Sequence, residues 1–292
     1  MLKSTVLVFV VVILTTLIMS PFAVAQDEPI PQTGYADVNG LHMYYEIHGT
    51  GEPLVVLHGA YMSINLMGEF VQRLAETRQV IAVELQGHGR TADIIDRPFS
   101  YEQLADDVAA LMEEIGVEQA DIFGYSMGGN TALQLAIRHP ERVRKLVVAS
   151  AAYNTDAYPP GFFEMVETIT PELFAGSPVE TDYLALAPNP ENFPTLVEKL
   201  VQLERDTQDW PAEDIQGIES PTLIIIGDSD AVRPEHAVDM FRLRGGGVNG
   251  DLTGLPNAQL AVLPATTHIG VLFRVDWVTS MIVEFLDAPM PE

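Results

Sequence analysis

The sequence has no cysteine and few basic residues, and each shortage excludes a class of function. Without cysteine there are no disulfides, thiolate metal ligands, cysteine nucleophile or lipid-modified N-terminal cysteine. The 292 residues include 15 Lys and Arg against 41 Asp and Glu, a formal net charge of −26 at pH 7. Because such an acidic surface repels phosphate backbones, we expect no nucleic-acid partner. Hydrophobic residues make up 47% of the chain, which is enough for a sizeable core.

The first 25 residues have the features of an export signal. Lys3 precedes an almost wholly apolar run at 6–18, and Ala23-Val24-Ala25 matches a small-x-small cleavage site. We therefore expect a signal peptide over 1–25 and export of the mature protein to a periplasm or the medium. The uncharged stretch 4–26 is long enough to span a bilayer, so an N-terminal membrane anchor is the alternative. We expect no membrane contact elsewhere.

Beyond the leader, short apolar segments alternate with segments of helical periodicity. This alternation predicts an α/β protein with a mostly parallel sheet and helices on both faces. Strands are expected at 41–48, 54–57, 80–83, 122–123, 146–148, 221–227 and 260–263, and helices at 64–76, 101–115, 131–138, 235–243 and 271–286.

The alternation stops near Ser150 and resumes at Pro221. The stretch 151–216 is rich in proline and aromatic residues, and its aromatic content argues against a disordered linker. We interpret it as a cap inserted into one α/β core. The expected organisation is a flexible lead-in at 26–34, core at 35–150, cap at 151–216 and core again at 217–292.

Ser126 lies in the stretch Gly124-Tyr125-Ser126-Met127-Gly128, after a predicted strand and before a predicted helix. A Gly-x-Ser-x-Gly turn of this kind reverses the chain sharply and holds the serine hydroxyl clear of the sheet. The helix N-terminus beneath it favours developing negative charge. An ordinary helix-capping serine is the alternative, but the strand-turn-helix context favours a nucleophile.

A serine nucleophile needs a base and a residue that orients the base. Asp228 and Asp230 follow one predicted strand, and His268 follows the next. Because the carboxyl ends of parallel strands share one edge, we expect these side chains to meet Ser126 there. Asp230 is favoured as the acid because it lies beyond the tight turn, whereas Asp228 is expected to cap that turn.

The oxyanion of such a reaction requires two backbone N–H donors. Met127 follows the serine and is expected to supply one; Ala60, or alternatively Tyr61, is expected to supply the other. Tyr61 and Tyr125 are further candidates for contacts with substrate. His58 and His88 lie in turns and are expected to be structural, and no ligand spacing predicts a metal or a cofactor.

These motifs together resemble the α/β-hydrolase fold family, over essentially the whole mature chain. The matching marks are His58-Gly59, Gly87-x-Gly89, Gly124-Tyr125-Ser126-Met127-Gly128-Gly129, Gly227-x-x-Asp230 and His268. The resemblance implies Ser126 as nucleophile, His268 as base, Asp230 as the orienting acid, and Ala60 and Met127 as oxyanion donors. Gln86 departs from the family pattern, where many members have arginine, and this predicts an altered ion-pair network. The "GYSMGG" turn is similar to that of cofactor-free haloperoxidases and related esterases.

We therefore expect an exported serine hydrolase that cleaves small carboxylic esters through an acyl-enzyme. The same residues allow cleavage of carbon–carbon bonds or lactones, or perhydrolysis. A ligand-binding receptor of low turnover is the alternative from another class.

Overall fold

The computed structural model describes residues 30–206 and 209–290. The predicted signal peptide and its cleavage site lie outside these ranges, as does the predicted lead-in up to residue 29. Among the described helices, none is both long and apolar enough to cross a bilayer.

Within the described residues, eight strands form one sheet in the order β1-β2-β4-β3-β5-β6-β7-β8. The first two strands pair in antiparallel fashion, and all strands from β4 to β8 run parallel. The predicted fold class is therefore confirmed. The strands are β1 (Gln32–Val38), β2 (Leu41–His48), β3 (Pro53–Leu57), β4 (Gln79–Val83), β5 (Ala120–Tyr125), β6 (Val143–Ala149), β7 (Thr222–Ser229) and β8 (Ala258–Thr267).

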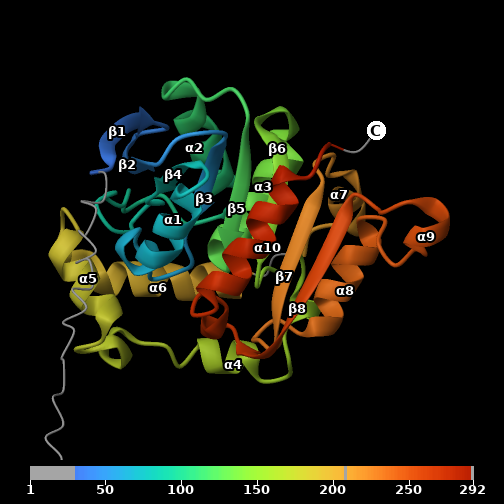
Figure 1. The fold of residues 1–292 in the computed structure, drawn as a ribbon. Helices are drawn as coiled ribbons and strands as arrows, with labels where there is room; N and C mark the ends of the chain where they lie inside the picture. The colour runs from blue at the N-terminus through green and yellow to red at the C-terminus, as the bar shows by residue number, and fades with distance from the viewer. Residues whose placement is uncertain (1–29, 207–208, 291–292) are drawn as a thin grey trace, which may run out of the picture.

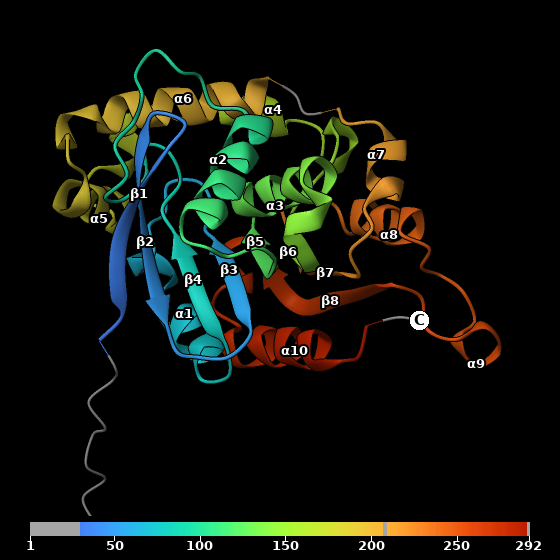
Figure 2. The same cartoon turned by 90° about the horizontal axis from the view of Figure 1, so that it is seen from above.

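Helices cover both faces of this sheet, as Figures 1 and 2 show. The α-helices are α1 (Gly68–Ala75), α2 (Tyr101–Glu114), α3 (Met127–Arg138), α4 (Phe162–Val166), α5 (Pro178–Leu186), α6 (Phe193–Arg205), α7 (Ala212–Gly217), α8 (Pro234–Leu243), α9 (Gly250–Thr253) and α10 (Val275–Asp287). Short 3₁₀ helices are η1 (Asn65–Met67), η2 (Pro140–Arg142), η3 (Thr155–Ala157), η4 (Pro171–Phe174), η5 (Pro190–Asn192) and η6 (Ile269–Val271).

Two apolar cores explain why the central strands are continuous hydrophobic runs. Helices α1 and α10 pack on one face, with Phe70 and Ile282 among the buried residues. Helices α2, α3 and α8 pack on the other, with Leu104 and Met240 buried. Because helices cover both faces of β3 to β6, side chains on either face of these strands are buried. The strands therefore show no alternation of apolar and polar residues.

Strand β1 corrects the expected lead-in, because Gln32, Thr33 and Gly34 belong to the sheet rather than to a flexible segment. Backbone pairing with β2 holds this edge strand in place over its whole length. Only Ala36 and Val38 of β1 are buried. The strand therefore carries too weak a hydrophobic pattern to be recognised from sequence.

The segment between β6 and β7 contains helices α4 to α7. Figure 1 places α4, α5 and α6 along the end of the sheet where β7 and β8 finish. Helix α7 instead packs against α3 and α8 beside the sheet. The aromatic rings of this segment stack on one another, as in Tyr158 with Phe162 and Tyr183 with Phe193. Its boundaries as a separate cap, 151–216, stay a prediction.

Candidate active site

Ser126 stands in the turn between β5 and α3 with a strained backbone. Its φ is 54° and its ψ is −121°, a conformation that costs a non-glycine residue on the order of 1–3 kcal/mol. From Ala120 to Ala136 every residue is buried except Ser126, which is partly exposed. The turn therefore presents one hydroxyl from an otherwise closed strand-turn-helix unit.

Two glycines make this turn sterically feasible. A Cβ at Gly124 would collide with the backbone carbonyl of Gly128, and a Cβ at Gly128 would collide with the carbonyl of Leu57. Helix α3 therefore lies directly against the end of β3. This close packing explains the spacing of the glycines on either side of Ser126.

His268 follows the last strand and reaches the serine. Its Nε2 is 2.9 Å from Ser126 Oγ, and its Nδ1 is 2.7 Å from Asp230 Oδ1. The register of β7 and β8 explains why Asp230 and His268 are in contact. Ser229 of β7 pairs with Thr267 of β8, and Asp230 and His268 are the residues that directly follow this pair. The structure thus brings together the three predicted side chains.

The side chain of Asp230 is fully buried and accepts several hydrogen bonds. Ser150 Oγ donates to its Oδ2 at 2.6 Å, and the Val232 N–H donates to its Oδ1 at 3.1 Å. Burial alone raises the pKa of the Asp230 carboxyl, but the bonds from His268, Ser150 and Val232 together hold that pKa below its ordinary value. The carboxylate is therefore ionised near neutral pH, and His268 Nδ1 carries the proton between them.

Asp228 has the capping role that the sequence predicts. It is exposed and accepts the N–H groups of Ala265 at 2.9 Å and Thr266 at 3.1 Å. These backbone bonds lower the pKa of its carboxyl. Its oxygens thus hold the β7 and β8 ends together and do not contact His268.

The predicted oxyanion donors lie just after the ends of β3 and β5. Strand β3 pairs in parallel with β5, Leu57 opposite Gly124, so the chain after β3 passes beside the serine turn. In the described chain, the N–H groups of Ala60 and Met127 have no hydrogen-bond acceptor. The Tyr61 N–H donates to His88 Nε2 at 3.3 Å, which favours Ala60 over Tyr61 as the second donor.

The two tyrosines predicted to contact substrate differ in their surroundings. Tyr61 is partly exposed and packs on Phe174 with ring centroids 4.8 Å apart. Tyr125 is buried, and its hydroxyl donates to the His268 carbonyl at 3.0 Å. Because this bond occupies the hydroxyl, Tyr125 supports the His268 loop. That position disagrees with the predicted contact between Tyr125 and substrate.

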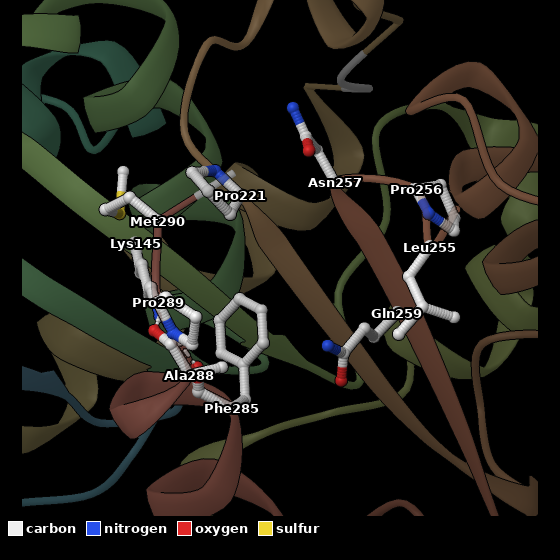
Figure 3. A pocket seen from close by; sticks show the side chains of 10 residues that line it. All are labelled: Lys145, Pro221, Leu255, Pro256, Asn257, Gln259, Phe285, Ala288, Pro289 and Met290. Carbon is white, nitrogen blue, oxygen red and sulfur yellow. Dashed lines mark hydrogen bonds between the residues drawn. The ribbon is translucent and has the colours of Figure 1, made fainter. Parts of the chain in front are cut away.

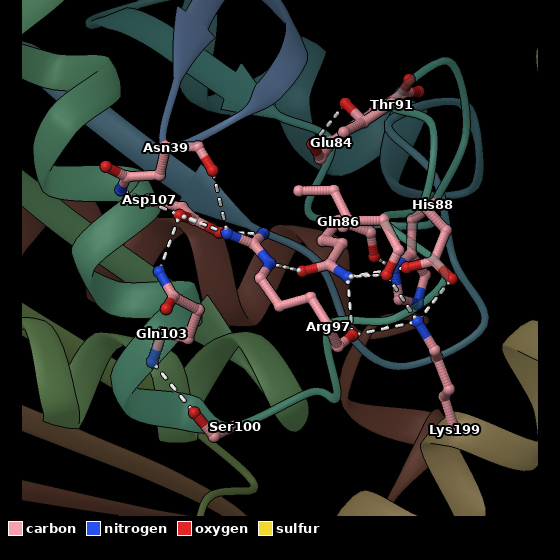
Figure 4. Close-up of polar contacts among 12 residues, drawn as sticks. Asn39, Glu84, Gln86, His88, Thr91, Arg97, Ser100, Gln103, Asp107 and Lys199 are labelled. Carbon is pink, nitrogen blue, oxygen red and sulfur yellow. Dashed lines mark hydrogen bonds and ion pairs between the residues drawn. The ribbon is translucent and has the colours of Figure 1, made fainter.

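Gln86 is the centre of the altered ion-pair network, which Figure 4 shows. Its Oε1 accepts from Arg97 Nε at 2.6 Å, and its Nε2 donates to Asp93 Oδ1 at 2.6 Å. Arg97 in turn pairs with the buried Asp107 at 2.7 Å. Lys199 of α6 pairs with Asp93 at 2.6 Å. The neutral amide therefore joins two ion pairs and ties α6 to the core.

A cavity of about 270 Å³ lies away from these residues, between the starts of β7 and β8 and the end of α10 (Figure 3). Lys145 is at its wall, but its Nζ already donates to the carbonyls of Phe285 and Leu286. The cavity is therefore separate from the Ser126 region. In residues 30–206 and 209–290, no cluster of three or more His, Asp or Glu could hold a metal ion.

Sequence reasoning missed Ser150. This residue directly follows β6, its φ is 55°, and its hydroxyl donates a hydrogen bond to Asp230. Nothing in the local sequence indicates the role of Ser150. Its contact with Asp230 exists because β6 and β7 are neighbours in the sheet.

Comparisons with known proteins agree with this architecture. The family model described as alpha/beta hydrolase fold matches residues 52–169. A putative carbamate hydrolase, RutD of Azorhizobium caulinodans, is 27% identical over 271 residues, covering 86% of this chain and 97% of that protein. A 2-hydroxymuconate semialdehyde hydrolase of a Pseudomonas species is 36% identical over 107 residues, which span 36% of this chain and 38% of that protein.

Solved structures show the same fold. The meta-cleavage product hydrolase of Pseudomonas fluorescens superposes with a TM-score of 0.70 at 22% identity, covering 88% of this chain and 97% of that chain. The enol-lactonase of Burkholderia xenovorans gives 0.66 at 22% identity, covering 87% and 100%. The chain therefore has the α/β-hydrolase fold, and the part of it at 52–169 matches that family's model. The names of its relatives support hydrolase activity.

Proposed function

We propose that this protein hydrolyses carboxylic esters with Ser126 as nucleophile, His268 as base and Asp230 as orienting acid. The observation that carries the proposal is the continuous hydrogen-bonded series from Asp230 through His268 to Ser126. The N–H groups of Ala60 and Met127, which have no acceptor among the described residues, support the proposal as candidate oxyanion donors.

The first half of the reaction forms an acyl-enzyme. Ser126 Oγ attacks the ester carbonyl while His268 Nε2 takes the hydroxyl proton. The carbonyl oxygen becomes an oxyanion that accepts hydrogen bonds from Ala60 and Met127. The C–O bond to the alcohol then breaks, and His268 returns the proton to the leaving oxygen.

The second half releases the acid. His268 takes a proton from water as the water oxygen attacks the acyl carbonyl. The bond to Ser126 Oγ breaks, and the serine regains a proton from His268. Throughout both halves the Asp230 carboxylate stabilises the imidazolium and holds its tautomer.

Lactone or carbon–carbon bond hydrolysis by the same residues is the second candidate. Two relatives favour it by name, the enol-lactonase and the 2-hydroxymuconate semialdehyde hydrolase. A panel of short esters, lactones and meta-cleavage products, with and without peroxide, ranks these activities by kcat/KM. The ester proposal requires the highest value on an ester.

Replacing Ser126 with alanine tests the nucleophile. The variant removes Oγ and should lower kcat for short p-nitrophenyl esters by about 10⁴- to 10⁶-fold. Ser229→Ala is the matched control, since Ser229 contacts Asp228 at the surface and should keep full activity. Undiminished hydrolysis by the Ser126 variant would reject the assignment. A wild type that binds esters without turnover would instead favour the receptor alternative.

We also propose export with cleavage after Ala25, which the sequence of the leader supports. Expression of the full chain in a bacterial host and mass measurement of the product tests it. The expected mass is that of residues 26–292 in the periplasm or medium. An intact chain in the membrane fraction would establish the anchor instead.

A further inference from the structure

Glu204, in the last turn of α6, is a carboxyl group that the proposed mechanism does not use. Its Oε1 lies 3.5 Å from the hydroxyl of Tyr101. The charge of the His268 imidazole opposes the rise that burial causes in the pKa of the Glu204 carboxyl, and the Glu204 charge adds to the rise in the pKa of the Tyr61 phenol. Helix α6 thus brings Glu204 within electrostatic range of His268.

The hydrogen-bond direction makes Glu204 an acceptor. The Asn130 side chain bonds the Tyr101 oxygen, and the Asn130 Oδ1 already accepts the Ala152 N–H at 2.9 Å. The Asn130 amide N–H therefore donates to the Tyr101 oxygen, and the Tyr101 hydroxyl donates its only proton to Glu204. Oxygen lone pairs on the carboxylate remain for a donor from elsewhere.

Aromatic rings lie close to Glu204. The Trp210 ring meets the Tyr101 ring edge-on with centroids 5.8 Å apart. Burial raises the pKa of the Glu204 carboxyl. Among the described residues, no lysine or arginine pairs with it. A desolvated carboxylate is costly unless a positive group pairs with it, and aromatic faces attract the same kind of group.

We propose, on the basis of the proposed function, that Glu204 determines specificity by binding a positively charged amino or quaternary ammonium group of the ester substrate. Tyr101, which bonds Glu204, and Trp210, which packs on the Tyr101 ring, lie beside this carboxylate. The net charge of −26 favours such substrates further, because an acidic surface raises the local concentration of cations.

Two pairs of isosteric esters test the charge preference directly. In the first, p-nitrophenyl 4-(trimethylammonio)butanoate is compared with p-nitrophenyl 5,5-dimethylhexanoate, so that the charge lies in the acyl group. In the second, 2-(trimethylammonio)ethyl acetate is compared with 3,3-dimethylbutyl acetate, so that it lies in the alcohol. Intrinsic reactivity cancels when the kcat/KM ratio of each pair is compared between enzyme variants.

Glu204→Gln keeps the shape and the acceptor for Tyr101 but removes the charge. We expect its cation-to-neutral ratio to fall roughly 10- to 100-fold below that of wild type in at least one pair, with kcat/KM for the neutral ester nearly unchanged. Glu204→Asp keeps the charge and should retain most of the preference. Glu198→Gln is the matched control, since Glu198 lies on the same helix, is exposed and should leave the ratio unchanged.

The outcomes separate this inference from the proposed function. Equal ratios in wild type and Glu204→Gln for both pairs, with hydrolysis that depends on Ser126, would overturn the subsite alone. A parallel loss on charged and neutral esters would mean that Glu204 acts on His268 or on folding, and would also overturn it. Hydrolysis that persists in Ser126→Ala would overturn the proposed function first.

Discussion

Two groups of histidines lie near the carboxyl edge of the sheet, and their hydrogen-bond partners differ in kind. His268 contacts two side chains, Ser126 and Asp230, and its ring is 28% exposed. His58 and His88 are 1% exposed, and their rings lie 4.9 Å apart. Each of these two rings bonds backbone groups through both nitrogens.

These different hydrogen-bond partners indicate different roles: His268 can exchange a proton, whereas His58 and His88 stabilise loops. Burial lowers the pKa of His58 to about 3 and that of His88 to about 4, so both rings are neutral at pH 7. Their nitrogens connect the turns that follow β3 and β4, including the Tyr61 N–H. Only His268 has a hydroxyl to deprotonate and a carboxylate to stabilise the resulting charge.

The largest expected effect follows removal of the His268 ring. His268→Ala should lower kcat for a short ester by about 10⁴- to 10⁶-fold, because Ser126 loses its base. His88→Gln is the matched control, since glutamine offers a donor and an acceptor to the same backbone groups. That variant should stay within a few-fold of wild type. Comparable losses in both variants would remove the distinction between the two groups of histidines.

The second effect concerns the acid that orients His268. Asp230→Asn should lower kcat by about 10⁴-fold, because the amide cannot stabilise the imidazolium or hold its tautomer. Asp228→Asn, two residues earlier, should change kcat little and reduce stability slightly, because Asp228 accepts only N–H groups and a surface serine. A larger loss of kcat for the Asp228 variant than for the Asp230 variant would contradict the assignment.

The smallest effect is the dependence of stability on pH. The pKa of His88 is depressed in the folded state, so only the unfolded chain binds its proton as pH falls from about 6.5 to 4. His88 therefore reduces stability on acidification by up to about 1.4 kcal/mol per pH unit. Glu84, whose pKa burial raises to about 7, acts in the opposite direction.

Comparing wild type with His88→Gln isolates this contribution, because Glu84 is present in both proteins. Urea unfolding at several pH values between 4 and 7 should show a smaller loss of stability on acidification in the variant. Parallel curves would show that His88 does not remain neutral in the folded protein.

The sequence predicted the core of the fold and the three side chains that meet. Strands β3 to β7 were recognisable because burial on both faces makes them continuous apolar runs. Ser126 was marked by its glycines, which only a close strand-helix turn requires. The position of Asp230 and His268 just beyond two strand ends then followed from a parallel topology.

Other features depend on contacts between distant segments and left no local signal. Ser150 bonds Asp230 only because β6 and β7 are neighbours. Glu204 comes within electrostatic range of His268 only because α6 folds back across the sheet edge, and the sequence of α6 resembles that of any amphipathic surface helix. Strand β1 is held mainly by backbone hydrogen bonds to β2. Such bonds do not depend on the side chains, so the sequence gives no sign of them.

Covalent labelling with a fluorophosphonate, read by intact mass and peptide mapping, tests the roles of Ser126 and His268 most directly. We expect one adduct per chain on Ser126, with no adduct in Ser126→Ala and greatly slowed labelling in His268→Ala. Labelling at another residue, or at an equal rate without the imidazole of residue 268, would contradict these roles.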